Sequence, residues 1–388
     1  MLPYTQSDPM EKYDSRSKLI FEGRLALQQR VLPAYRAPFF DLLASSCDGG
    51  LSIFAGEPRS EESINTEAEL HVALYWPAKN RHFLHPASGL YLCWQSDILD
   101  WLADWRPDAL IVEANPRCLS TRQAVRWAYS QGHPVLGWGL GVPSSKDLLS
   151  WMWGRIWRSW LLSLDGVIAY SHKGAAQYRA MGVPPERVFV ATNAVTPAPK
   201  EPTPDRPVDL LDPPVILFVG RLQRRKRVDL LLEACRSLPK SNQPRLVIVG
   251  DGPARDELES LAKRIYPQTE FPGAVHGSDL EPYYIQADLF VLPGTGGLAV
   301  QQAMAYGLPI IVAQGDGTQE DLVRPENGWQ IPSDDLPALI HALSIALRDV
   351  SRLRRMGIES YRIVSEEINL STMVKVFVQA LHEVSASE

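Results

Sequence analysis

A glycine-rich segment in the second half of the chain has the composition of an anion-binding loop. Gly294–Gly297 follows the apolar run Leu289–Leu292, which is typical of a strand with both faces covered, and precedes a helix predicted over 298–306. Free backbone N–H groups and the positive end of the helix dipole would point into this loop, which suits a phosphate. A glycine-rich turn without a ligand gives the same pattern, so the neighbouring sequence has to decide.

Two cationic residues, Arg221 and Lys226, follow another predicted strand at Val215–Val219. A further strand, Arg245–Val249, leads into the turn at Gly250–Pro253. The carboxyl ends of parallel strands open at one edge of a sheet, where open α/β folds bind their ligands. We therefore expect both cations and the glycine loop to lie together and to hold an anion.

Polar and aromatic residues also follow predicted strands in the first half of the chain. The strand signals there lie at 25–32, 51–54, 70–74, 109–112, 135–137 and 167–170. The residues of interest that follow them are Arg36, Glu113, Asn115, Arg117 and Trp138. A carboxylate, an amide, a guanidinium and an indole together suit a polyhydroxylated ligand. The alternative is that these residues hold one another or, for Arg36, that it pairs with Asp41 or with solvent.

The segment 146–163 is rich in tryptophan. Trp153, Trp157 and Trp160 fall on one predicted helical face, whereas Trp151 lies off that face beside two arginines. An aromatic, basic helix of this kind can lie in a membrane interface. A crossover helix that packs its main face on a sheet explains the pattern as well. Trp151 is the residue that this second interpretation explains least.

The length of 388 residues is sufficient for two domains, and seven prolines between 196 and 214 indicate a stiff linker between them. The expected division is a lead-in over 1–22, a first domain over 23–196, a linker over 197–213, a second domain over 214–365 and a closing helix over 366–388. Alternating strand and helix patterns predict an α/β protein with two parallel sheets.

Composition narrows the class of protein. Hydrophobic residues make up 45% and charged residues 22%, as in soluble globular proteins, and a net charge of −6 argues against a nucleic-acid partner. The four cysteines lack C-x-x-C spacing, and the chain opens with a polar segment over 5–18. We expect a cytoplasmic protein, with at most peripheral membrane contact, because no apolar run reaches the roughly 18–20 residues that span a bilayer.

Six sequence motifs follow one another in the second half of the chain. They are G-R-L-x-x-x-K at 220–226, V-I-V-G-D-G-P at 247–253, F-P-G-A-V at 271–275, Y-Y-I-Q-A-D-L-F-V-L-P at 283–293, G-L-A-V-Q-Q-A-M-A-Y-G-L-P at 297–309 and E-N-G at 326–328. Together they resemble the retaining glycosyltransferases of family 4. S-H-K-G-A-A at 171–176 and T-N-A-V at 192–195 resemble the end of that family's first domain.

The resemblance implies a GT-B fold, in which two Rossmann-like domains face each other across a cleft. The second domain would hold a nucleotide-sugar donor and the first domain the acceptor, while the segment 351–384 would cross back onto the first domain. By this resemblance Arg221 and Lys226 hold the donor diphosphate, Gly297 and Leu298 offer it backbone N–H groups, and Ala274 and Val275 line the base. The other donor-side residues would be Gly220, Gly252, Gly294, Thr295, Gly296 and Gln302.

The chain departs from the family at two of these positions. The family usually has two glutamates with seven residues between them, one near the transferred sugar and one on the ribose hydroxyls. Gly294 and Gln302 occupy the matching positions here. The Gln302 amide can still bind a ribose hydroxyl, whereas Gly294 offers only its backbone.

These observations lead us to expect a retaining hexosyltransferase that uses a nucleoside diphosphate sugar and needs neither a metal nor another cofactor. Arg221, Lys226 and the loop amides would stabilise the leaving diphosphate. By resemblance that leaving group takes the acceptor's proton, although His172 and Glu113 are candidate bases. The acceptor would be a glycan, a lipid-linked molecule or a small molecule. The alternatives are a non-catalytic protein that binds a nucleotide or nucleotide sugar, suggested by the missing glutamates, and a phosphorylase or epimerase.

Overall fold

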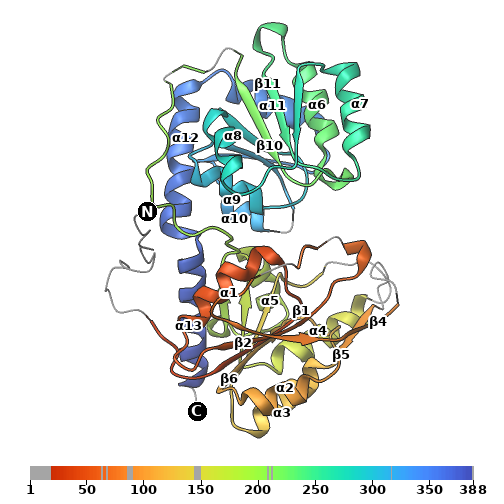
Figure 1. Ribbon diagram of the computed structural model, residues 1–388, viewed down its shortest axis with the longest axis vertical. Coiled ribbons are helices and arrows are strands. Elements are labelled where there is room, and N and C mark those ends of the chain that lie inside the picture. Colours follow the sequence, from red (N-terminus) through yellow and green to blue (C-terminus); the bar gives the residue numbers. More distant parts are fainter. Residues whose placement is uncertain are drawn as a thin grey trace, which may run out of the picture.

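The computed structural model describes residues 19–62, 64–66, 69–84, 91–143, 150–207, 209–210, 213–315 and 317–386. They form two α/β halves, one above the other in Figure 1, that are joined by an extended crossing segment and by the long C-terminal helices. The polar opening segment over 5–18 and residues 146–149 of the tryptophan-rich stretch lie outside the described residues.

The first half is built on a parallel sheet of seven strands in the order β3-β2-β1-β6-β7-β8-β9. Its strands are β1 (Leu25–Val31), β2 (Leu51–Gly56), β3 (Leu74–Ala78), β6 (Ala109–Glu113), β7 (Val135–Gly139), β8 (Gly166–Ala169) and β9 (Val188–Val190). Its helices are α1 (Ala37–Ala44), α2 (Ile98–Trp105), α3 (Thr121–Ser130), α4 (Ser150–Leu162) and α5 (His172–Ala180). A short antiparallel hairpin, β4 (Asn80–Phe83) with β5 (Leu92–Gln95), stands beside it.

One predicted strand of this half was placed too early. The sequence predicts a strand over 70–74, but β3 begins at Leu74 because the backbone N–H groups of His71, Val72 and Ala73 donate to the carboxylate of Asp41. The strand itself contains Pro77, which an edge strand tolerates because one side needs no ladder hydrogen bond. Asp41 is thus engaged with this turn and does not pair with Arg36.

The second half is built on a parallel sheet of six strands in the order β12-β11-β10-β13-β14-β15. Its strands are β10 (Val215–Val219), β11 (Arg245–Val249), β12 (Thr269–Gly273), β13 (Leu289–Leu292), β14 (Ile310–Ala313) and β15 (Gly328–Ile331). Its helices are α6 (Val228–Ser237), α7 (Arg255–Ile265), α8 (Glu281–Gln286), α9 (Leu298–Ala305), α10 (Thr318–Leu322), α11 (Leu336–Ala346) and α12 (Val350–Arg362).

Both sheets reverse their strand order at one place, β1 beside β6 in the first and β10 beside β13 in the second. Ligands of open α/β sheets bind in the crevice beyond the carboxyl ends of the strands at such a switch point. β10 and β13 have no exposed side chain along their length, in agreement with the continuous apolar runs of their sequences. The segments after these four strands are therefore where a functional site is expected.

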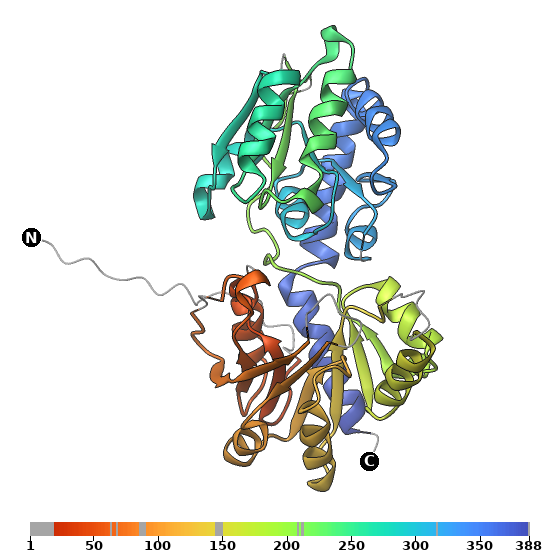
Figure 2. The ribbon, with the colours of Figure 1, turned by 90° about the vertical axis from the view of Figure 1, so that its right-hand side faces the viewer.

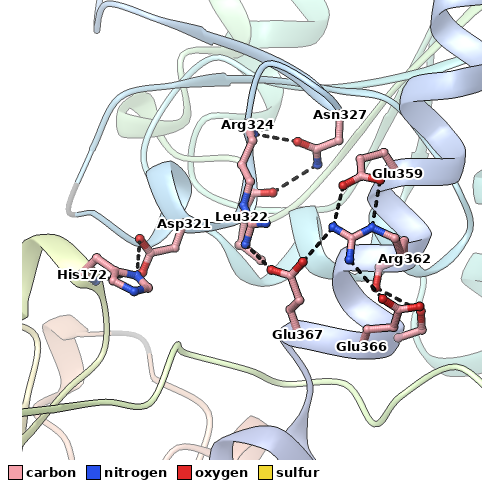
Figure 3. Close-up of polar contacts among 10 residues, drawn as sticks. His172, Asp321, Leu322, Arg324, Asn327, Glu359, Arg362, Glu366 and Glu367 are labelled. Carbon is pink, nitrogen blue, oxygen red and sulfur yellow. Dashed lines mark hydrogen bonds and ion pairs between the residues drawn. The ribbon is translucent and has the colours of Figure 1, made fainter.

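The chain returns from the second half to the first at its C-terminal end. Helix α12 passes through a π-helical turn at Ile363–Glu367 into α13 (Leu370–Ser385), which runs down the first half (Figure 2). Phe377 of α13 lies 5.0 Å from the rings of both Phe39 and Trp138. Arg362 at the end of α12 and Glu367 of the turn belong to a network of ion pairs with Arg324 of the second half (Figure 3).

Candidate functional site

The glycine loop after β13 lies against a lysine that follows β10. The Lys226 ammonium group donates to the carbonyl oxygen of Thr295 at 2.6 Å, and the Arg225 guanidinium reaches the hydroxyl of Thr295 at 3.2 Å. Gly296 has a φ of +131°, and a Cβ placed there would lie 2.2 Å from the Lys226 Nζ atom. Only glycine can occupy this position without displacing the lysine.

Helix α9 begins directly after this loop, with Gly297 at its N-cap and no side chain capping its first turn. Its leading N–H groups and the positive end of its dipole are therefore available to a ligand in the loop. The loop is held from the other side by Gln319, whose amide donates to the Gly296 carbonyl oxygen at 2.7 Å. Lys226, Thr295, Gly296, Gly297 and Leu298 thus come together as the sequence suggested.

Arg221 is exposed at the end of β10, the strand that lies next to β13. The turn that carries it packs closely on the turn after β11. Leu222 N–H donates to the Asp251 carbonyl, and a Cβ on Gly252 would lie 2.4 Å from the Leu222 oxygen. Gly252 therefore permits the close approach of the two turns.

Gly294 has no room for a side chain. A Cβ at this position would lie 2.3 Å from the Arg225 carbonyl oxygen and 2.5 Å from the Lys226 carbonyl carbon. The Thr295 N–H donates to the same Arg225 oxygen at 3.1 Å, so the two loops are joined backbone to backbone. Gly294 is thus part of the packing that brings Lys226 to the loop.

The remaining donor-side residues are more dispersed. Gln302 is half-buried on α9, and its amide oxygen accepts from the Tyr284 hydroxyl at 3.3 Å. Ala274 is exposed and Val275 half-buried in the segment after β12, one strand beyond the Gly250–Pro253 turn.

The first half contains a cavity of about 550 Å³ at the carboxyl ends of its strands. Four of the residues singled out in the sequence line it, namely Glu113, Asn115, Arg117 and Trp138. The loops after β6 and β7 lie side by side because the two strands pair in parallel, with Glu113 opposite Trp138.

Sequence reasoning missed several residues of this cavity. Arg30, Tyr170 and Lys173 also line it, and so does Gly315 from the second half of the chain. Arg30 lies within β1 and Tyr170 directly follows β8, so the rule that sheet ligands gather at strand ends could have pointed to both. Gly315 could be found only from the tertiary structure, since the Lys173 ammonium donates to its carbonyl oxygen at 3.1 Å across the two halves.

Glu113 is the acidic residue of the cavity wall. Burial raises the pKa of its carboxyl group, and the backbone N–H of Arg30, which donates to it at 2.7 Å, opposes this shift only in part. The Arg30 guanidinium itself pairs with Glu62 at 2.9 Å. A carboxyl group in this setting retains its proton more readily than a solvated one.

Arg36 and His172, the other two candidates, do not line the cavity. Arg36 is 4% exposed and stacks over the Trp138 and Tyr170 rings at 5.0 and 5.1 Å. The His172 backbone N–H and its ring Nδ1 both contact the Asp321 carboxylate, at 2.9 and 3.2 Å, so this residue joins the two halves (Figure 3).

Gln301, which precedes the predicted site residue Gln302, has the larger role in holding the two halves together. Gln301 is 1% exposed, and its amide oxygen accepts from the N–H groups of Val195 and Thr196 while its amide nitrogen donates to the Ile368 carbonyl. It therefore ties α9 to both segments that cross between the halves. The motif Q-Q-A-M-A carries no signal that separates the two glutamines.

Helix α4 packs as a crossover helix. Trp157 and Trp160 are each 5% exposed in the core, whereas Trp151 is 71% exposed and lies 5.2 Å from Arg155. Among the described residues, no helix is both long and apolar enough to span a membrane. Over the same ranges, no group of three or more His, Cys, Asp or Glu side chains is arranged to hold a metal ion.

Comparisons with known proteins match part of the chain by sequence and most of it by structure. Residues 213–349 match the family model of glycosyl transferases group 1. HepE of Anabaena in complex with UDP has a TM-score of 0.67 at 15% identity, covering 93% of this chain and 99% of that one. Sucrose-phosphate synthase from Thermosynechococcus elongatus has a TM-score of 0.65 at 20% identity, covering 94% and 100%. The chain has a GT-B fold. This confirms the fold expected from the sequence.

Curated relatives are similar over shorter stretches. An uncharacterised glycosyltransferase of Methanocaldococcus jannaschii is 34% identical over 129 residues, which are 32% of this chain and 33% of that protein. The GDP-mannose-dependent alpha-mannosyltransferase of Mycobacterium tuberculosis is 34% identical over 164 residues, 40% of this chain and 41% of that protein. The chain therefore spans less than half the length of either relative.

Proposed function

We propose that this protein is a glycosyltransferase that moves a hexose from a nucleoside diphosphate sugar to an acceptor, with retention of configuration and without a metal. The observation that carries the proposal is the contact of Lys226 with the glycine loop at the start of α9, inside a GT-B fold. Support also comes from relatives whose names describe glycosyltransferases and from a solved neighbour that holds UDP.

The chemistry follows from charge. The bond between the anomeric carbon and the diphosphate oxygen breaks, and the acceptor oxygen bonds to that carbon from the same face. Negative charge then develops on the diphosphate, where Lys226, Arg221 and the first N–H groups of α9 would stabilise it. The acceptor's proton goes to the leaving phosphate oxygen, so the reaction requires no protein base.

The acceptor would lie in the 550 Å³ cavity of the first half, which reaches Gly315 of the second half. Trp138 and Tyr170 provide aromatic surface there, and Asn115 and Glu113 provide hydrogen-bonding groups. A lipid-linked acceptor would place the protein at a membrane surface. The exposed Trp151 beside Arg155 on α4 supports such a peripheral contact.

Release of nucleoside diphosphate from a panel of nucleotide sugars tests the proposal. Replacing Arg221 and Lys226 together by alanine should lower the rate at least ~100-fold, the size expected when charge stabilisation is removed from a leaving group. The matched control replaces the exposed Lys263 and Arg264 of α7 by alanine and should keep the parent rate.

Two results would count against the proposal. Undiminished release by the Arg221 and Lys226 double variant would remove the assignment of these residues. Affinity for nucleotide sugars without any release by the parent protein would indicate a non-catalytic nucleotide-binding protein instead.

A further inference from the structure

The cavity of the first half carries more positive than negative side chains. Arg30, Arg117 and Lys173 line it, together with Glu113. Two of the cations already have partners outside the cavity, since Arg30 pairs with Glu62 at 2.9 Å and Lys173 with Glu320 at 3.0 Å. The third cation is Arg117.

Arg117 has no carboxylate partner among the residues that the structure describes. Its guanidinium stacks over the Trp153 ring at 5.4 Å, and its Nε atom is buried without a hydrogen-bond acceptor. The backbone N–H group of Arg117 donates to the Asn115 side chain at 3.1 Å, which holds the backbone of Arg117 in position. A guanidinium that is fixed by an aromatic ring and lines a cavity is ready to bind an anion through parallel N–H groups.

A second arginine does not line the cavity but stacks on two residues that do. Arg36 is 4% exposed, and its Nη1 atom is buried without a hydrogen-bond acceptor in the described part of the chain. It stacks on Trp138 and Tyr170, whose rings line the cavity. Cation–π contacts offset part of the cost of burying this charge, and no carboxylate among the described residues pairs with it.

Glu113 is the one carboxyl group among the described residues that line this cavity. Burial raises its pKa, which favours the neutral form. A neutral carboxyl group also does not repel an anionic ligand, and it can donate a hydrogen bond to one.

Gln319 links the glycine loop to a residue of the cavity wall. The Gln319 amide nitrogen donates to the Gly296 carbonyl at 2.7 Å, and its amide oxygen lies 2.8 Å from the position of a Cβ on Gly315, which lines the cavity. The Gly315 end of the cavity therefore faces the side of the molecule that carries the glycine loop.

We propose that this cavity binds an anionic group of the acceptor, a carboxylate or a phosphate, with Arg117 as its main partner and Arg36 as a second source of positive charge. The inference rests on the proposed function in that the ligand is called an acceptor. The anion site itself stands on the two arginines and the cavity. The substrate class is thus an acidic sugar or a phosphorylated compound, and not a neutral glycan.

Calorimetric titration of the full chain with small probes tests this inference. Methyl glucuronide and methyl phosphate represent the two anion sources, and methyl glucoside is the neutral match of the first. We expect at least one anion to bind about tenfold or more tightly than methyl glucoside, as a charge-assisted pair implies, and the better anion identifies the source. Equal binding of glucuronide and glucoside, without phosphate binding, would overturn the proposal, as would no anion binding up to about 10 mM.

Variants assign the effect to Arg117. The change Arg117→Gln should weaken the bound anion about tenfold, and Arg117→Lys should weaken it less because the charge remains while the planar fork is lost. Arg126→Gln on α3, an exposed arginine outside the cavity, is the matched control and should bind as the parent. Thermal melting establishes that each variant is folded. Parent affinity in a folded Arg117→Gln variant would refute the role of this residue.

The Lys226→Ala variant separates this inference from the proposed function. It should lose nucleotide binding and keep anion binding in the first half. If the parent binds the anion but no nucleotide sugar, the transferase proposal fails and the anion site stands. If the parent releases nucleoside diphosphate but binds no anion, the anion site is refuted and the transferase proposal stands.

Discussion

The ammonium group of Lys226 lies 2.6 Å from the carbonyl oxygen of Thr295, although 69 positions separate the two residues. They meet because β10 and β13 are neighbours at the point where the strand order of the second sheet reverses. The contact brings a cation to the N-terminal end of α9, where two sources of positive potential add.

A glutamate side chain at position 294 should harm the protein. In the Gly294→Glu variant the new Cβ would meet the Arg225 carbonyl oxygen at 2.3 Å, so the loop must move away from Lys226. We expect a loss of about 1–3 kcal/mol in the free energy of unfolding, as for other overpacked sites, and lower activity. Urea unfolding and diphosphate release measure the two effects.

Position 302 provides the control for that experiment. A glutamate at position 302 can still accept from the Tyr284 hydroxyl, so Gln302→Glu should change the free energy of unfolding by less than about 0.5 kcal/mol. A stable and more active Gly294→Glu variant would contradict the packing argument.

Gln301 should matter more for stability than its neighbour Gln302. The Gln301→Leu change leaves the Val195 N–H and the Ile368 carbonyl without their partners in a buried place, which should cost about 1–3 kcal/mol. Gln302→Leu removes a single long hydrogen bond at a half-buried position and should cost less. Denaturant unfolding compares the two variants, and equal losses would show that Gln301 does not tie the crossing segments to α9.

Glu113 should make stability depend on pH. Its pKa is raised in the folded protein above the ordinary value of 4.5, so the folded state holds its proton to higher pH than the unfolded state. The stability that this contributes is complete below about pH 4.5 and is lost as pH rises through the raised pKa. The Glu113→Gln variant has no titrating carboxyl group at this position and should not lose this stability as pH rises. Urea unfolding across that pH range gives the difference between the two proteins, and a constant difference would contradict the assignment.

Trp151 should contribute to binding at an anionic membrane surface. Replacing this 71% exposed indole by alanine removes an interfacial anchor next to Arg155. Flotation with phosphatidylglycerol vesicles should show severalfold weaker binding for Trp151→Ala. The control is Ile358→Ala, which removes a 64% exposed apolar side chain from α12 in the other half. Absence of binding by the parent, or equal binding by both variants, would remove membrane contact through α4.

Much of the fold could be read from local patterns. Continuous apolar runs such as Val215–Val219 and Leu289–Leu292 predicted the buried strands, because a strand covered on both faces must be apolar throughout. Edge elements such as β3, β9 and the β4–β5 hairpin were misplaced or missed. Their burial is one-sided or their length short, so their composition differs little from that of loops.

The sequence by itself determined that glycines follow one buried strand and cations follow another, and hence that an anion-binding edge was to be expected. Only the tertiary structure decided which side chains meet there. Gly294 has to be glycine because a carbonyl oxygen from 69 residues earlier lies against it, and Gln301 is buried because two crossing segments close over it. Such contacts depend on where distant backbone lies, and no local pattern of residue types encodes that position.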